Sequence, residues 1–154
     1  MVKHGPMDEN SNQSSDQHLT DDDERATAAL RKFGIPPSID YLHEIRELLA
    51  KETQSDRRFG NEYLRVLCFL LWTNQDPMDA PAIASAKFSD FDAGCMIDTQ
   101  FLVCGDLDVV RKTLLNADTP GAKRALDWLE GWEHATERES FDDKIAHEQN
   151  YYGV

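Results

Sequence analysis

The chain has 154 residues, 40% of them hydrophobic, which is enough for one domain around a single core. Its formal net charge of -13 repels phosphates and anionic lipids, so we expect it to bind neither nucleic acid nor a membrane surface. The longest apolar run, near residues 66–72, is far shorter than the ~20 residues that cross a bilayer, and the first residues lack the apolar stretch of a signal peptide, so we expect a cytoplasmic protein.

Residues 1–20 consist mainly of Ser, Asn, Gln, Asp and His, with almost no large apolar side chain. Such a segment cannot bury enough apolar surface to offset the entropy lost on ordering. The sequence therefore predicts a disordered tail over residues 1–20 and a single helical domain over residues 21–154.

Two amphipathic helices are predicted first. Acidic residues 21–24 favour a helix start, and Gly34 can end this helix. Its inner face has the apolar residues Ala26, Ala29, Leu30 and Phe33. After Pro36-Pro37, Ser38 can cap the second helix. The predicted stripe of this helix is Ile39, Leu42, Ile45, Leu48 and Leu49.

Residues 61–72 include the most apolar run of the chain, and the second half of this segment is apolar on every side. This pattern predicts the central, most buried helix. A short helix over residues 78–88 should follow, because Asp76 can cap it and Pro77 fits the first helical position.

Residues 89–104 have two interpretations. Ser89 can cap a helix, whereas residues 95–104 alternate in part like a strand. Because every neighbouring segment is predicted to be helical, we favour helix here. Three further helices are expected, one capped by Asp106, one starting at Thr119-Pro120, and one over residues 141–149. The predicted fold is all-α, as a compact multi-helix bundle or a short helical-repeat-like array.

Residues 85–92 contain an Ala-Lys and a Phe-Asp pair, and residues 97–100 have an Ile-Asp-x-Gln pattern. In these residues the chain resembles a group of uncharacterised bacterial all-helical proteins. Members of the group also tend to end in Tyr-Tyr-Gly, as residues 151–153 do. The resemblance spans about residues 62–154, although the Gly-Ala-Gly-like turn of the group is Gly105-Asp106-Leu107 here. No activity comes with the group, so no catalytic residue is implied.

The cysteines do not predict a metal site. Cys68, Cys95 and Cys104 lie in apolar surroundings without the close spacing of zinc ligands, and we expect buried, reduced thiols. Residues 90–94 resemble the start of a calcium loop, but the twelfth position is Phe101 instead of Glu. A helix cap at Ser89 or Asp90 is the simpler interpretation, and we expect no metal and no cofactor.

Asp98 and Gln100 are polar residues inside an apolar run, so each needs a partner if it is buried. We expect a structural network in which they cap neighbouring helix ends or pair with Lys87. The alternative is an enzyme of hydrolase type, with Asp98 or Asp92 as a catalytic carboxylate. The sequence has no Gly-rich phosphate loop and no nucleophile motif that would support it.

Trp128 and Trp132 are four residues apart and share a face of their predicted helix. Such a pair belongs either to the core or to an anchor for a partner. With the acidic residues Glu137 and Glu139 nearby, we hypothesise a non-enzymatic module that binds another, basic protein, for example as an inhibitor of the immunity type. A structural subunit of a larger complex is a further alternative.

Overall fold

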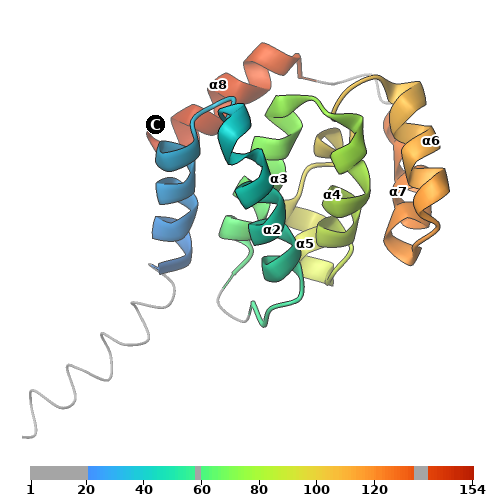
Figure 1. Ribbon diagram of the computed structural model, residues 1–154, viewed down its shortest axis with the longest axis horizontal. Coiled ribbons are helices and arrows are strands. Elements are labelled where there is room, and N and C mark those ends of the chain that lie inside the picture. The colour runs from blue at the N-terminus through green and yellow to red at the C-terminus, as the bar shows by residue number, and fades with distance from the viewer. Residues whose placement is uncertain (1–20, 58–59, 134–138) are drawn as a thin grey trace, which may run out of the picture.

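The computed structural model describes residues 21–57, 60–133 and 139–154, and the tail predicted for residues 1–20 lies outside them. Within the described residues the fold is all-α, as predicted, and contains no strand (Figure 1). Residues 21–33 are helical. The other α-helices are α2 (Leu42–Thr53), α3 (Glu62–Asn74), α4 (Ala80–Lys87), α5 (Phe91–Met96), α6 (Leu107–Ala117), α7 (Pro120–Glu133) and α8 (Phe141–Tyr152). Short 3-10 helices are η1 (Ile39–Tyr41), η2 (Pro77–Asp79) and η3 (Thr99–Leu102).

Helix α3 is the centre of the core, as its uniformly apolar sequence predicts. From Tyr63 to Thr73 every side chain except that of Arg65 is buried. Each large apolar side chain removed from water contributes about 1.5–3 kcal/mol. Helices α2, α4 and α5 pack on α3, whereas α6 and α7 pack on α4. In Figure 1, α8 runs along the top of the molecule, and α6 and α7 lie at the edge opposite the first helical segment.

The N-terminus of α3 is capped by a residue from a distant part of the chain. Asp22, in the first helical segment, accepts a hydrogen bond from the Glu62 backbone N–H at 3.0 Å. Asn61 occupies the cap position itself but makes no capping side-chain bond. Burial raises the pKa of Asp22, while the bond from Glu62 acts in the opposite direction. Gly60 has a φ of +140°, and a Cβ there would meet the Asp22 carboxylate at 2.9 Å.

The second predicted helix begins differently from the expectation. Ser38 does cap a helical turn, but that turn is the 3-10 helix η1, in which Ile39 is 80% exposed. Placing Ile39 on the inner stripe was therefore wrong. A 3-10 turn advances about 120° per residue instead of about 100°, which moves Ile39 away from the face formed by Leu42, Ile45 and Leu49.

The caps predicted for the following helices are confirmed. Asp76 accepts a hydrogen bond from Met78 N–H, although the helix predicted over residues 78–88 is divided into η2 and α4. Asp106 accepts bonds from Asp108 and Val109 at the start of α6. Helix α7 begins at Pro120, as expected, and Thr119 adds a cap that was not predicted by accepting a bond from Ala122 N–H. These caps work because each side chain reaches an N–H only two or three residues away.

The ambiguous segment 89–104 forms two short helical pieces, α5 and η3. The cap of α5 is Asp90, which accepts from Ala93 N–H at 2.7 Å, and not Ser89. Ile97 then adopts extended geometry with ψ of 115°, which ends α5 before Asp98 caps η3. Ile97, Phe101 and Leu102 are buried.

Helix α8 is longer than predicted and ends at Tyr152 instead of near residue 149. Ser140 caps it by accepting a hydrogen bond from Asp143 N–H. Among the described residues, no helix has both the length and the apolar character to cross a bilayer.

Candidate functional site

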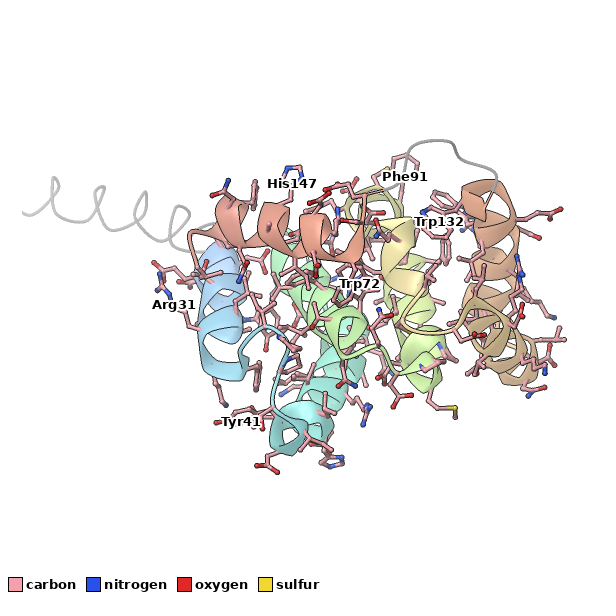
Figure 2. All side chains as sticks on the ribbon, turned by 90° about the horizontal axis from the view of Figure 1, so that it is seen from above. Arg31, Tyr41, Trp72, Phe91, Trp132 and His147 are labelled. Carbon is pink, nitrogen blue, oxygen red and sulfur yellow. The ribbon has the colours of Figure 1, made fainter. Side chains whose placement is uncertain are left out.

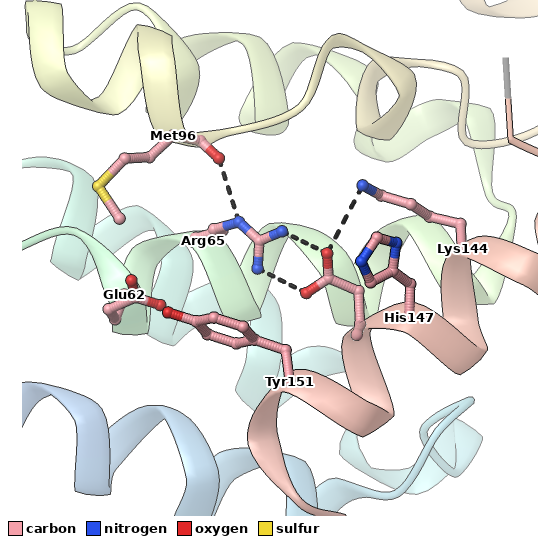
Figure 3. A pocket seen from close by; sticks show the side chains of 7 residues that line it. Glu62, Arg65, Met96, Lys144, His147 and Tyr151 are labelled. Atoms are coloured by element: carbon pink, nitrogen blue, oxygen red, sulfur yellow. Dashed lines mark hydrogen bonds and ion pairs between the residues drawn. The ribbon is translucent and has the colours of Figure 1, made fainter. Parts of the chain in front are cut away.

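Two hollows lie on either side of the short helix α5. The first, of about 270 Å³, is here called the aromatic cleft, and its lining residues are Phe88, Asp90, Phe91, Gly94, Cys95, Arg124 and Trp128. The second, of about 290 Å³, is called the charged pocket (Figure 3), and its lining residues are Glu62, Arg65, Met96, Lys144, His147, Glu148 and Tyr151. Helix α5 contributes to both hollows and therefore forms the ridge between them.

Three aromatic rings line the aromatic cleft, one at the end of α4, one at the start of α5 and one on α7. Phe88 ends α4, and its ring meets the Trp128 ring of α7 edge-on with the centroids 5.5 Å apart. The guanidinium of Arg124, one turn before Trp128, lies 4.8 Å from the centre of the Phe88 ring. Phe91 opens α5 and is 83% exposed at the outer edge of the molecule (Figure 2). The cleft therefore presents an exposed ring beside a fixed aromatic pair.

The side chain of Lys87 lies beneath the aromatic cleft and contacts two of the elements that form it. Its ammonium donates hydrogen bonds to the carbonyl of Gly94 at 2.6 Å and to the carbonyl of Ile97. It also lies 4.4 Å from the centre of the Trp128 ring. Burial lowers the pKa of Lys87, because the charged form loses hydration. Lys87 thus joins the end of α5 to the ring of α7.

The charged pocket is organised around an ion pair between helices far apart in sequence. The guanidinium of Arg65 on α3 donates from both terminal nitrogens to the two carboxylate oxygens of Glu148 on α8 (Figure 3). Its Nε donates to the carbonyl of Met96 at 3.1 Å. Burial acts to lower the pKa of Arg65, but the bonds to Glu148 outweigh it and raise that pKa above its ordinary value.

Lys144 is the second cation of this pocket. Its ammonium lies 2.7 Å from a carboxylate oxygen of Asp98, 3.6 Å from Glu148 and 3.9 Å from Glu139. Asp98 also accepts a hydrogen bond from Gln100 N–H at 2.9 Å, which caps η3. Burial acts to raise the pKa of Asp98, but these two donors hold it below its usual value.

Tyr152 closes the network at the end of α8. Its hydroxyl donates to Glu62 at 2.6 Å and accepts from Arg65 at 3.2 Å. Burial raises the pKa of Tyr152, and the bond to Glu62 adds to this effect. The buried residues of α8 are Lys144 and Glu148, so charge contacts join this helix to its neighbours in addition to the apolar contacts of Phe141 and Ile145.

The structure separates the polar residues that were predicted to form one network, because Asp98 and Gln100 lie near Glu139 whereas Lys87 lies beneath the aromatic cleft. Asp98, Gln100 and Glu139 come together, because Gln100 donates to the Glu139 carbonyl at 3.0 Å and Lys144 lies between the two carboxylates. The charge partner of Asp98 is Lys144, and Lys87 instead contacts backbone carbonyls. Glu137 lies outside the described residues.

The two tryptophans differ in their surroundings. Trp128 is 44% exposed and lines the aromatic cleft, whereas Trp132, one turn later on α7, is half-buried. The prediction of three buried thiols was wrong for Cys95, which is exposed in the cleft. Cys68 and Cys104 are buried, and burial raises the pKa of Cys104 to about 12.

Sequence reasoning missed Arg65, Lys144 and Glu148. One signal was available, because Arg65 is the one charge inside the apolar run of residues 63–72 and must find a partner once that run is buried. The i,i+4 spacing of Lys144 and Glu148 indicates a local pair but not the helix that it faces.

Within the described part of the chain, no group of three or more His, Cys, Asp or Glu side chains is arranged to hold a metal ion. Comparison of the chain with protein-family models, with curated proteins and with solved structures finds no match.

Proposed function

We propose that this protein is an interaction module that binds a basic segment of another protein in the aromatic cleft. One observation carries the proposal, namely that Phe91 is 83% exposed beside the half-open Phe88–Trp128 pair in a hollow of about 270 Å³. Leaving such a ring in water costs the free energy that its burial would return. A partner side chain that fills the hollow would recover it.

The residue types in the cleft suit protein recognition. Trp, aromatic and Arg side chains dominate the energetics of protein interfaces because they combine large area with few rotatable bonds and directed polar groups. Arg124 is held over the Phe88 ring, and its guanidinium makes no ion pair with any residue that the structure describes. Its N–H groups are therefore free to bind backbone carbonyls of a partner.

The charge of the chain favours a basic partner. Its formal net charge is -13, and exposed carboxylates adjoin two exposed rings of the cleft, Asp92 next to Phe91 and Asp127 next to Trp128. Long-range attraction would raise the association rate, while the rings would supply most of the affinity. An inhibitor of a basic protein is one concrete form of this function. The resemblance to uncharacterised bacterial proteins adds no activity to the proposal.

The alternative of a carboxylate enzyme receives less support. A general acid or base works best with a pKa near the operating pH. Asp98 is bound by Lys144 and by Gln100 N–H, and its pKa is held below the usual value instead of being raised. These contacts suit a structural role.

The test uses two defined helical peptides of about 15 residues, a length at which isolated helices become marginally stable. One carries Leu on one face and Lys on the other, and the second has Glu in place of Lys. We expect calorimetry to detect binding of the Lys peptide alone, with an affinity that falls as salt is added. Phe91→Ala and Trp128→Ala should each weaken binding by about tenfold or more, as loss of an interface anchor does.

Leu115→Ala is the matched control, because Leu115 is an exposed apolar residue on α6, away from the cleft. Its affinity for the Lys peptide should equal that of the unmodified protein. If both cleft variants also bind normally, the attraction is merely that of a polyanion for a polycation, and the cleft is not the binding site.

A further inference from the structure

The charged pocket and the aromatic cleft share helix α5, and this helix has few apolar contacts to fix it. It contains six residues, of which only Ala93 is fully buried. A helix this short is not stable by itself in water. The position of α5, and hence of Phe91, therefore depends on the contacts that neighbouring elements make with its backbone and its cap.

Three cationic side chains make those contacts. Lys87 donates to the carbonyls of Gly94 and Ile97, and Arg57 donates to the cap residue Asp90 at 3.1 Å. Arg65 donates to the carbonyl of Met96, the last residue of α5. Lys87 contacts α5 from the side of the aromatic cleft, and Arg57 contacts the start of α5. Arg65 reaches the end of α5 from the charged pocket.

Arg65 also binds α8. Its guanidinium is shared between Glu148 and Met96, so the geometry of one contact constrains the other (Figure 3). A guanidinium suits this task because it is planar and presents N–H groups in fixed directions. Lys144 adds a second link, since it joins α8 to Asp98 immediately after α5.

We infer that the docking of α8 fixes the position of α5 and thereby regulates the shape of the aromatic cleft, with Arg65 as the positioning residue. When α8 is docked, Glu148 holds Arg65 on the Met96 carbonyl, and α5 presents Phe91 beside Trp128. When α8 detaches, Arg65 loses its carboxylate, the end of α5 loosens and the cleft loses its shape. This inference rests on the proposed function of the cleft, and thermodynamic linkage requires that a partner bound there strengthens the docking of α8.

The test is hydrogen exchange of the full chain in the absence of any partner, so its outcome is independent of whether the cleft binds a protein. Glu148→Gln keeps the size of the side chain but removes its charge. We expect exchange to become at least about tenfold faster in residues 141–152 and in residues 91–97, because opening a cooperative unit exposes all its amides. Residues 42–53 in α2 should be unchanged.

Glu130→Gln is the matched control, since Glu130 is exposed on α7. It should alter none of the three segments. Faster exchange in residues 141–152 alone would overturn the inference, because α8 would then detach without affecting α5. Uniformly faster exchange would overturn it too, because the network would then serve global stability.

Arg65→Lys tests the contact with the Met96 carbonyl separately from the ion pair with Glu148, because it keeps the positive charge that pairs with Glu148. A single ammonium lacks the forked geometry that reaches both Glu148 and the Met96 carbonyl. We expect faster exchange in residues 91–97 than in the control, with residues 141–152 less affected. An unchanged α5 in this variant would show that Arg65 does not position it.

Discussion

Lys87→Met tests whether the buried lysine beneath the aromatic cleft stabilises the fold. The change keeps a long, flexible side chain but leaves the Gly94 and Ile97 carbonyls without their donor. An unsatisfied buried carbonyl costs about 1–3 kcal/mol, and the lost contact with Trp128 costs about 0.5–2 kcal/mol. The variant also avoids burying a charge, which offsets part of the loss. We expect a net loss of about 2 kcal/mol in the free energy of unfolding.

Urea unfolding followed by circular dichroism measures this loss, and Lys112→Met on the exposed surface of α6 is the control. The control should change stability by less than about 0.5 kcal/mol. Because burial lowers the pKa of Lys87 below 10.5, the unfolded chain binds this proton more tightly than the folded chain. The stability that Lys87 contributes should therefore rise as the pH increases toward 10.5.

Two results would refute this reasoning. A variant as stable as the unmodified protein would mean that the carbonyls find other donors or that the charge is a net cost. A difference between the two proteins that shrinks with rising pH would contradict the direction of the pKa shift.

Three further outcomes are expected. Leu67→Ala should lower the free energy of unfolding by about 2–5 kcal/mol, since Leu67 is fully buried in α3, and a loss below about 0.5 kcal/mol in a urea titration would contradict its core position. Asp98→Asn should lower stability above pH 3.8, because the unmodified protein loses the contribution of Asp98 only as pH falls below 3.8 through the lowered pKa of that carboxyl. The melting temperatures of the two proteins should therefore converge in acid, and a constant gap would refute this. A thiol reagent should modify Cys95 alone in the folded protein and all three cysteines after unfolding, and rapid reaction of a second thiol in the native state would mean that Cys68 or Cys104 is accessible.

The features that sequence predicted are those decided by neighbouring residues. The burial of α3 follows from a run that is apolar on every side, and the caps by Asp76 and Asp106 each involve an N–H only two or three residues away. Ile39 shows the limit of this reasoning, because its apolar character fits the stripe while the 3-10 geometry of its turn directs it outward.

The sites depend on contacts that no local pattern specifies. Arg65 and Glu148 are 83 residues apart, and Phe88, Phe91 and Trp128 meet only after α4, α5 and α7 have packed. Trp128 was identified from its spacing to Trp132, but its contact with the Phe88 ring forms only when α4 and α7 pack together. The distribution of exposed rings and paired charges is thus a property of the tertiary structure.

The bond from Asp22 to the start of α3 means that two separate stretches of chain must meet to complete the central helix. A cut between residues 34 and 38 would separate the helical segment that carries the acceptor Asp22 from the rest of the domain without interrupting α2 or α3. The larger fragment would keep the apolar run of α3 but lose its acceptor at Glu62. Added in trans, a peptide covering residues 21–33 would be expected to restore this end, and the same peptide with Asn at position 22 to restore it less well. The domain is therefore a natural subject for fragment complementation.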